Sequence, residues 1–456
     1  MTRGRSYTGP VTDRRRAIVL VHNPVAPYSR ALRIARSLEA DGWEVLIAGT
    51  ARGGLPDEDR DGTIRIVRAR PAGPLALFVQ GAGPGARARL VHRTDGMLAA
   101  AGGLVARATH VRLLARARTP TPRRVLGVVR WPLPARAWSE GLRRVLPPAD
   151  LYHACGIGAL FAAHALARDA RRQGRTGRVV YDVIDIFLDG NAYATMPGPL
   201  RRLYARREVE LVGRSDAVVT VNEAIAAELR RRWSLATEPV VVRNCPPWQP
   251  PPEVPPQDLR LAAGLPPTTR LVLFLGILGP DRGLLESGEA VLRVPDAAFV
   301  AMGFGPWFER LRALDRDAAH AGRHVTLPPV HPDEVPRWAA GADAVLIAVP
   351  GDSLNQRLST PNTFWEGLTA GVPLVVGRDL RVMRAIVEAH DLGAVADPSD
   401  PDDLARALAA VLDAPPDVRT ARRERALALY RDVYRWDVQA RALVEQAARL
   451  VPVAAG

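Results

Sequence analysis

Short apolar runs alternate with longer amphipathic stretches over most of the chain. In the first half the runs are rich in Val, Ile, Leu and Ala and lie at 17–22, 43–48, 63–67, 150–154, 178–183, 217–221 and 239–243. A second series follows at 271–275, 297–302, 324–327, 342–348, 374–376 and 394–396. Apolar runs separated by helical patterns are typical of parallel sheets covered by helices on both faces. The pattern predicts an α/β protein with two doubly wound, Rossmann-like domains.

A proline-rich stretch separates the two series and predicts a stiff, extended linker. Helical patterns such as 307–319 and 401–412 lie between the strands of the second series, and the chain after 417 is helical without strands. We expect the two domains to face a cleft at the carboxyl ends of their strands, where ligands bind in this architecture. The expected parts are a basic flexible tail (1–16), an N-terminal domain (17–243), a linker (244–258), a C-terminal domain (259–415) and C-terminal helices packing back on the first domain (416–456).

Composition excludes several classes of protein. The chain has 456 residues, 47% of them hydrophobic and 24% charged, which suits a soluble globular protein of two or three domains. All 62 basic residues are Arg, so the lysine of a P-loop, of a pyridoxal Schiff base and of a kinase strand is missing. Cys155 and Cys245 are too few for a disulfide framework, a zinc ribbon or an iron–sulfur site. A reduced, cytoplasmic setting is expected.

Neither a signal peptide nor a membrane span is expected. The first apolar run, 17–21, has only five residues before His22, Asn23 and Pro24 interrupt it. The longest apolar stretch, 97–106, is about half of the roughly 20 residues that a span needs.

The positive charge is concentrated in one segment. The formal net charge is +14, and residues 68–147 hold fifteen Arg against two acidic residues. Apolar residues and the aromatic Trp131 and Trp138 lie between these arginines, a mixture expected of helices lying on an anionic membrane. A solvated helical insertion is the alternative. Nucleic acid is not expected as a partner, because Tyr and Phe are missing from stacking positions in the segment.

The stretch 359–376 carries the clearest chemistry. It predicts a loop, a helix that begins near Pro361, an acidic residue in the first turns, Gly371 as the C-cap and a buried strand. A helix N-terminus binds anions, and Glu366 could accept hydrogen bonds from two adjacent sugar hydroxyls. The stretch therefore indicates a pocket for a nucleotide diphosphate, although a capped helix with a dipole-favourable Glu gives the same pattern.

The order of this stretch resembles the S-x-P-N-K-x-F-E-x-x-x-x-G-x-P motif of family four glycosyltransferases of the GT-B fold. Further segments at 276–283, 303–306 and 330–335 fall in the family's order in the C-terminal half, and 215–225 and 242–246 do so in the N-terminal half. The resemblance covers about 17–67 and 150–430. We name no counterpart for 68–147, which we read as a basic helical insertion in the first domain.

The resemblance implies roles for individual residues. Glu366 would bind the ribose of the donor, the amides around 360–363 its diphosphate, and Arg282 the charge that develops on the leaving diphosphate. An exposed ion pair of Arg282 with Asp281 or Glu286 is the alternative role. The donor-binding set is Gly276, Arg282, Gly303, Pro306, Thr360, Asn362, Thr363 and Glu366.

Four positions depart from the family pattern. Leu358 replaces an acidic residue eight positions before Glu366, Thr363 replaces the Lys of the motif, Ile277 replaces an Arg of the first loop, and Ile184 replaces a His that points toward the transferred sugar. The contacts with the sugar and the diphosphate are therefore fewer than in the fullest version of the motif.

Candidate acceptor residues lie at strand ends and in the first loop of the N-terminal domain. Asp182 and Asp185 could orient hydroxyl groups, or could cap helices instead. His153 ends a strand where family members carry a His, and Ser29 and Arg30 lie in the first loop. Asp185 and Arg282 are the candidate catalytic residues.

The resemblance implies a retaining glycosyltransferase that needs no metal and no cofactor besides its nucleotide sugar. The basic segment adds the hypothesis of a lipid-linked or cell-envelope glycan acceptor, with the protein peripheral on the inner face of the cell membrane. Two alternatives stay open: a catalytically degenerate binding or scaffold protein of the same fold, and a nucleotide-sugar epimerase.

Overall fold

The computed structural model describes residues 14–25, 28–72, 132–190, 193, 196–252, 256–320 and 322–453, without the side chains of 132–134. The chain forms two compact units. The first comprises Met1–Val183, Ala192–Val218 and Ala447–Gly456, and the second comprises Ile184–Asn191 and Val219–Gln446. Residues 1–13 of the predicted tail and residues 73–131 of the basic segment lie outside the described residues. The tail was predicted to extend to Arg16, but Arg16 is buried as the first residue of β1.

The N-terminal sheet has eight strands in the order β3-β4-β2-β1-β5-β6-β7-β8. Its strands are β1 (Arg16–Val21), β2 (Glu44–Thr50), β3 (Glu58–Asp61), β4 (Ile64–Ala69), β5 (Leu151–Cys155), β6 (Arg178–Val183), β7 (Ala217–Thr220) and β8 (Val240–Val241). The parallel pairs β2–β4, β1–β2, β1–β5, β5–β6 and β7–β8 agree with the predicted α/β class. Because the chain turns from one side of β1 to the other, the topological switch point lies between β1 and β5.

The strand β3 was not predicted. It is a polar edge strand that pairs antiparallel with β4. Its sequence, Glu-Asp-Arg-Asp, has no apolar run, because an edge strand needs only backbone hydrogen bonds and no buried face.

The helices of this half are α1 (Ser29–Ala40), α6 (Pro132–Leu142), α7 (Ile157–Arg172), the 3-10 turn η1 (Phe187–Asp189), α8 (Gly198–Val212) and α9 (Glu223–Trp233). Trp138 on α6 is fully buried, and its Nε1 donates to the Gly49 carbonyl at 3.0 Å. Our interpretation of Trp138 as a membrane-surface residue was therefore wrong, since its ring lies in the core.

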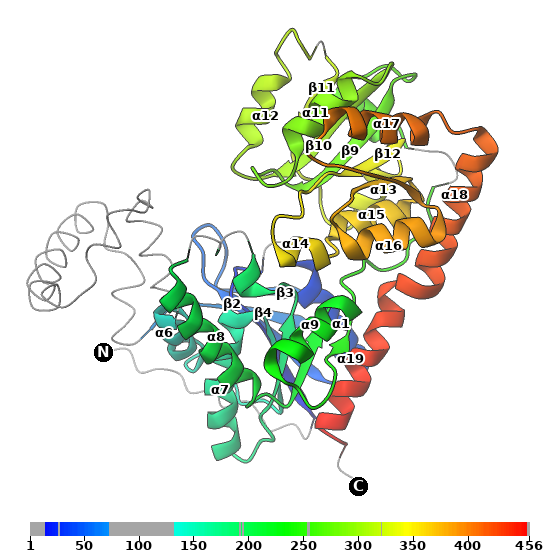
Figure 1. Cartoon of the computed structure of the whole chain (residues 1–456). Helices are drawn as coiled ribbons and strands as arrows, with labels where there is room; N and C mark the ends of the chain where they lie inside the picture. The colour runs from blue at the N-terminus through cyan, green and yellow to red at the C-terminus, as the bar shows by residue number, and fades with distance from the viewer. Residues whose placement is uncertain are drawn as a thin grey trace, which may run out of the picture. The chain divides into compact units, whose positions relative to one another are not determined.

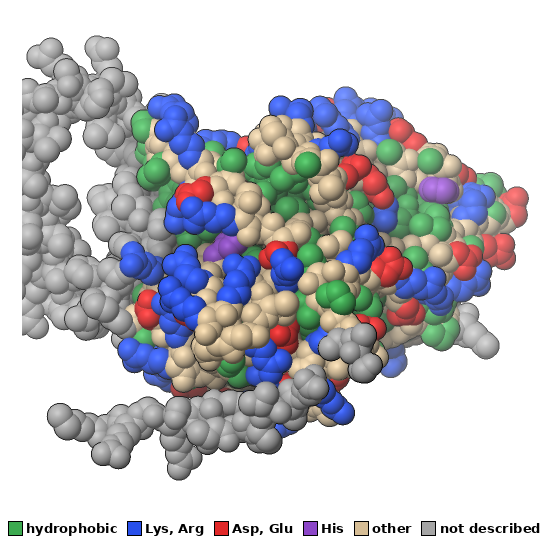
Figure 2. Space-filling model, turned by 90° about the horizontal axis from the view of Figure 1, so that it is seen from below, with side chains coloured by type: hydrophobic (Ala, Val, Ile, Leu, Met, Phe, Trp, Pro, Cys, Tyr) green, Lys and Arg blue, Asp and Glu red, His purple; other side chains and the backbone are tan. Residues whose placement is uncertain are grey.

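Arginines at both ends of the basic segment also belong to the fold. Arg68 is buried and donates to the carbonyls of Pro24 and Pro56 and to Asp59. Arg143 pairs with Glu140 and Asp169. On the face seen in Figure 2, arginine side chains are spread among acidic ones and form no single basic patch within the described part. Arg68 and Arg143 are therefore engaged in contacts within the fold.

The C-terminal sheet has six strands in the order β11-β10-β9-β12-β13-β14, and every adjacent pair is parallel. Its strands are β9 (Arg270–Ile277), β10 (Ala297–Phe304), β11 (His324–Leu327), β12 (Ala344–Ile347), β13 (Leu374–Gly377) and β14 (Gly393–Ala396). Alternate residues of β9 enter two separate cores: Leu271, Leu273 and Leu275 enter one, and Val272 and Phe274 the other. Both faces are therefore covered, as a doubly wound sheet requires.

The helices of this half are α10 (Asp258–Ala263), α11 (Leu284–Leu292), α12 (Phe308–Leu314), α13 (Val335–Ala339), α14 (Leu354–Leu358), α15 (Asn362–Ala370), α16 (Arg381–His390) and α17 (Pro401–Leu412). Figure 1 shows α11 and α17 together over one face of the sheet and α15 over the other. The helix predicted over 307–319 ends already at Leu314, because the next residue, Asp315, bonds to the ring of His324 and to Thr326.

The chain ends in α18 (Pro416–Leu429), a π-helical turn η3 (Tyr430–Tyr434) and α19 (Trp436–Leu450). The linker is anchored to this region, because the Pro246 carbonyl accepts hydrogen bonds from the Tyr430 hydroxyl at 2.6 Å and from the Trp436 amide. No helix in the described part of the chain is long and apolar enough to cross a membrane.

Candidate functional site

The predicted donor residues meet at the carboxyl edge of the C-terminal sheet. The switch point of this sheet lies between β9 and β12, since the strand order continues to β10 on one side and to β13 on the other. Gly276 and Gly303 are the penultimate residues of β9 and β10 and are register partners. The Thr363 hydroxyl at the start of α15 donates to the Leu275 carbonyl at 2.7 Å. Three separate segments of the motif are thus in contact where ligands bind in such sheets.

At this edge of the C-terminal sheet, two positions can hold only glycine because neighbouring backbone atoms lie too close for a Cβ. A Cβ on Gly303 would lie 1.8 Å from the Gly276 carbonyl oxygen, and one on Gly283 would lie 1.9 Å from the Ala348 oxygen. Gly283 also has φ +64°, a conformation that favours glycine. The loop 276–283 is therefore held tightly between the ends of β10 and β12.

Arg282 lies in this loop and forms a long ion pair with Asp281, one of the two partners named in its alternative role. Its Nε is buried and has no hydrogen-bond partner among the described residues, and the nearest acidic atom, Asp281 Oδ1, is 3.8 Å away. About a third of the side chain is exposed, 31%. A buried guanidinium nitrogen without a partner is costly, so a ligand anion would satisfy it.

The helix α15 begins one residue later than we expected. Pro361 is its N-cap residue, so the helix starts at Asn362, and Gly371 is the left-handed C-cap with φ +69°, as predicted. Thr360 is 5% exposed, and its Oγ1 has no hydrogen-bond partner among the described residues. The first amides of a helix have no partner within it, so Thr360 and these amides form a site ready for an anion.

The other α15 residues have mixed environments. Asn362 accepts a hydrogen bond from Asn244 at 2.9 Å, and the Thr363 hydroxyl is bound to β9, which leaves its amide for a ligand. Glu366 is half-buried about one turn into the helix. Pro306, after the end of β10, is exposed.

The segment in front of α15 is braced by a buried asparagine that we had not singled out. Asn222 is 1% exposed, caps α9 by accepting from the Ile225 amide, and donates to the Leu358 carbonyl at 2.8 Å. Leu358, which stands where the family has an acidic residue, is itself buried at 7% exposure. An asparagine before a helix can be recognised in the sequence as a candidate N-cap. The hydrogen bond from Asn222 to Leu358 cannot be recognised in this way, because the two residues are far apart in the sequence.

Asp185 belongs to the same compact unit as the donor residues. It follows β6 in the segment Ile184–Asn191, which clusters with the C-terminal unit. The Asn355 side chain on α14 donates to Asp185 Oδ1 at 3.0 Å and accepts from the Ile186 amide at 2.7 Å. The two candidate catalytic residues, Asp185 and Arg282, therefore lie in one unit.

Three candidate acceptor residues form a buried cluster in the N-terminal unit. Arg30 donates to both carboxylate oxygens of Asp182, at 2.8 and 2.7 Å, and His153 Nε2 lies 3.2 Å from the same carboxylate. All three side chains are at most 1% exposed. Ser29 begins α1 and is half-buried. The cluster joins α1 to β5 and β6, and its part in acceptor binding stays a prediction.

The electrostatics of this cluster follow from burial and pairing. Burial by itself would raise the pKa of Asp182, but the Arg30 guanidinium and the His153 ring outweigh it and hold that pKa well below its ordinary value. Burial, together with the Asp182 carboxylate, raises the pKa of the Cys155 thiol well above its usual value. The thiol is therefore neutral and unreactive at neutral pH.

The same cluster has the spacing of a metal site, but its charges disfavour a cation. Ligand atoms of His153, Cys155 and Asp182 lie within 4.8 Å of one another. Arg30 already occupies both carboxylate oxygens, and a cation there would face the guanidinium and a protonated thiol. These residues do not fit a resident metal ion.

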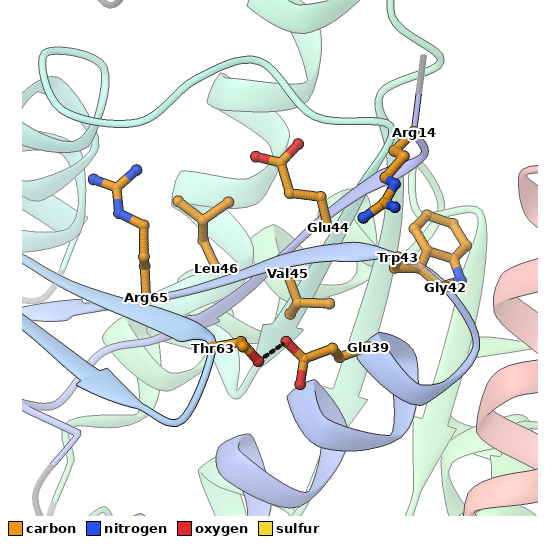
Figure 3. Close-up of a pocket in the computed structure, with 9 residues that line it drawn as sticks. All are labelled: Arg14, Glu39, Gly42, Trp43, Glu44, Val45, Leu46, Thr63 and Arg65. Carbon is orange, nitrogen blue, oxygen red and sulfur yellow. Dashed lines mark hydrogen bonds between the residues drawn. The ribbon is translucent and has the colours of Figure 1, made fainter. Parts of the chain in front are cut away.

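A hollow of about 550 Å³ lies at the opposite end of the N-terminal sheet, near the amino ends of β2 and β4. Figure 3 shows Glu44, Leu46 and Arg65 on one side of the strands and Val45 and Thr63 on the other. Because the hollow follows the sheet edge and mixes both charges, we assign no function to it.

His22 is a further residue that sequence reasoning did not single out. It directly follows β1 at the switch point, and its ring lies so close to α7 that a Cβ on Gly158 would be 2.9 Å from it. Burial lowers the pKa of His22, so the imidazole is neutral at pH 7. Its position becomes visible only when the strand order is known.

Two family models match the chain. Residues 269–414 match the model described as glycosyl transferases group 1, and residues 94–245 match the glycosyl transferase 4-like domain. The second match includes 94–147 of the basic segment, for which we had named no counterpart. A search of curated proteins gave no significant match.

Solved structures share the fold at low identity. The sucrose-phosphate synthase of Thermosynechococcus elongatus has a TM-score of 0.66 and 15% identity, over 96% of this chain and 99% of that one. Anabaena HepE in complex with UDP-glucose has a TM-score of 0.61 and 14% identity, over 95% and 99%. The trehalose 6-phosphate synthase of Burkholderia multivorans has a TM-score of 0.61 and 16% identity, over 97% and 100%. These likenesses establish the two-domain GT-B fold.

Proposed function

Because the chain is a glycosyltransferase of the GT-B fold, with a group 1 domain in its C-terminal half and a 4-like domain in its N-terminal half, we propose that it uses a nucleoside diphosphate sugar as donor. The observation that carries this proposal is the meeting of Gly276, Gly303 and the N-terminus of α15 at one sheet edge, in the unit that also holds Arg282, whose buried Nε has no hydrogen-bond partner among the described residues. A diphosphate needs both the helix amides and a cation, and this edge offers both.

In the proposed mechanism the sugar is transferred with retention of its anomeric configuration. The amides of α15 and the Arg282 guanidinium stabilise the negative charge of the departing diphosphate. Glu366 accepts from the ribose hydroxyls, and Asp185 orients a hydroxyl of the reacting sugars. The acceptor hydroxyl attacks the face that the diphosphate leaves and passes its proton to the departing phosphate. Because the charge is met by these groups, we expect no metal ion or further cofactor to be needed.

Nucleotide binding is tested by thermal unfolding with UDP, GDP, ADP and dTDP. A ligand at a hundredfold its Kd adds about 2.7 kcal/mol to the stability of the domain that binds it. For a domain of about 200 residues this is a shift of a few degrees. We expect one nucleotide to stabilise the wild type but not Glu366→Ala, while Glu309→Ala, an exposed control on α12, behaves as the wild type. If none of the four stabilises the protein, the scaffold alternative is favoured.

The proposed acceptor is a lipid-linked or cell-envelope glycan, bound mainly by the N-terminal unit at an anionic membrane surface. The support is the excess of Arg over acidic residues between 87 and 130. Arg68 and Arg143, near the two ends of the basic segment, do not count toward it, because they are engaged in contacts within the fold. Sedimentation with vesicles tests this proposal. Anionic vesicles should bind the wild type, and should bind it more weakly at high salt. They should not bind the triple variant Arg112→Glu/Arg116→Glu/Arg118→Glu. Equal binding of both proteins would contradict a membrane role for the segment.

A sugar phosphate is the second candidate acceptor. Two of the similar structures are named as a sucrose-phosphate synthase and a trehalose 6-phosphate synthase. Product analysis with glucose 6-phosphate and fructose 6-phosphate as acceptors distinguishes it from the lipid-linked glycan. Proton NMR of the product's anomeric signal tests retention in either case.

A further inference from the structure

The short helix α14 is held in a defined orientation. Ser353 accepts a hydrogen bond from the Gln356 amide, and the Gln356 side chain accepts from the Ser353 amide, which is a complete capping box. These two hydrogen bonds fix the start of the helix, and with it the direction in which the side chains of Asn355 and Gln356 leave the helix.

Each of these two side chains reaches a loop that carries a candidate catalytic residue. The Gln356 side chain donates to the carbonyl of Asp281, directly before Arg282, at 3.5 Å. The Asn355 side chain bonds both to Asp185 and to the amide of Ile186. The helix α14 therefore touches the loop after β9 and the loop after β6 at neighbouring positions.

The chemistry of its partners determines the orientation of the Asn355 amide group. Its oxygen must face the Ile186 N–H, and its NH₂ group must face the Asp185 carboxylate, because the opposite assignment would set donor against donor and acceptor against acceptor. Among the described residues, Asn355 is the only side chain with a hydrogen bond to Asp185. Asp185 is otherwise exposed, so this bond selects one of the rotamers open to its carboxylate.

We infer that Asn355 is a positioning residue that orients the Asp185 carboxylate for sugar transfer. The inference rests on the proposed function, in which Asp185 touches a reacting hydroxyl. A carboxylate that rotates freely spends only part of its time in the productive orientation, and misplacement on the scale of 1 Å can lower a rate by about a hundredfold.

The test measures turnover of UDP-glucose, GDP-mannose, ADP-glucose and dTDP-glucose by the wild type and five variants. Asn355→Asp keeps an acceptor for the Ile186 amide but sets a second carboxylate against Asp185, so it separates orientation from folding. Asn355→Leu removes both bonds. Asp352→Asn is the matched control, since it removes an exposed negative charge three residues away. Asp185→Asn and the double variant Asn355→Asp/Asp185→Asn complete a mutant cycle.

We expect Asn355→Asp to lower kcat by tenfold or more, on the scale of a lost orientation, with a much smaller change in KM. The thermal shift given by the nucleotide that stabilises the wild type should be kept, because the proposed nucleotide contacts lie on α15 and Arg282. In the double variant the loss should equal that of Asp185→Asn alone, and Asp352→Asn should behave as the wild type.

Three results would overturn the inference. Wild-type turnover in Asn355→Asp would show that the bond does not matter, and losses that multiply in the double variant would show that Asn355 acts independently of Asp185. A kcat loss of the same size in Asp352→Asn would reveal a nonspecific charge effect. A wild type that turns over none of the four nucleotide sugars would instead overturn the proposed function, and the inference with it.

Discussion

Arg30 and Asp182 form a bidentate ion pair in which both side chains are at most 1% exposed. The pair joins the helix after β1 to the end of β6, and His153 from β5 bonds to the same carboxylate. The helix α1 and the strands β5 and β6 are thus connected through a single carboxylate. A buried pair of this kind fixes geometry more than it adds net stability.

The first prediction concerns the stability of this pair. Arg30→Met should destabilise the N-terminal unit by about 3–5 kcal/mol, because it leaves the Asp182 charge buried without its partner. Arg30→Met/Asp182→Leu should be less destabilised than either single variant, since no charge then remains. Urea unfolding followed by Trp fluorescence measures all three. An additive double variant would contradict the coupling of the two residues.

A second prediction concerns pH. The pKa of Asp182 is lower in the folded than in the unfolded protein, so its contribution to stability is complete above the unfolded value of about 3.9 and is lost as pH falls through the folded value. The stability difference between the wild type and Asp182→Asn should therefore be largest near pH 7 and should shrink below about pH 4. A stability difference between these two proteins that grows as the pH falls below about 4 would contradict a lowered pKa of Asp182.

The third prediction tests the close packing of the donor edge. Gly303→Ala places a methyl group 1.8 Å from the Gly276 carbonyl, so the loop after β9 must move and nucleotide stabilisation should be lost. Gly53→Ala is the matched control, because a Cβ there meets nothing within 4 Å. A nucleotide-dependent thermal shift that survives in Gly303→Ala would place the donor elsewhere.

The fourth prediction concerns the charge of Arg282. Arg282→Met should lower the rate of transfer by about 10²–10³-fold, the effect of removing one preorganised group that stabilises developing charge. Arg282→Lys should recover part of this rate, because Lys restores the charge without the forked donor geometry. Steady-state kinetics with the donor identified by thermal shift measures both. Equal loss in the two variants would mean that geometry alone matters.

The fifth prediction concerns metal ions. In the proposed mechanism the helix amides and Arg282 stabilise the diphosphate charge, and Arg30 occupies the Asp182 carboxylate. EDTA should therefore leave activity and melting temperature unchanged. Activity that is lost on chelation and restored by Mg²⁺ or Mn²⁺ would contradict this. Dialysis against EDTA, followed by assay with and without added cation, is sufficient.

Local patterns in the amino-acid sequence were sufficient to predict the class of fold and to locate the candidate donor segments. Apolar runs separated by helical patterns are local signals, and they located twelve of the strands on which the two parallel sheets depend, within a few residues. A thirteenth run, 239–243, became only the short β8, and the polar edge strand β3 carried no signal. The motif around Glu366 and the glycines at 276 and 303 were also visible, because helix caps and tight approaches restrict residue types locally.

The contacts between residues that are distant in sequence became known from the folded chain alone. Arg30 and Asp182 are 152 positions apart, and Asn355 and Asp185 are 170 apart, so no local pattern links them. Our interpretation of Trp138 was wrong for the same reason. The local sequence around an aromatic residue beside arginines is the same whether its ring faces a membrane or lies in a core. Here the ring lies in the core and donates to the Gly49 carbonyl. Hydrophobic periodicity assigns residues to elements, but the order of the strands in the sheets determines which side chains meet.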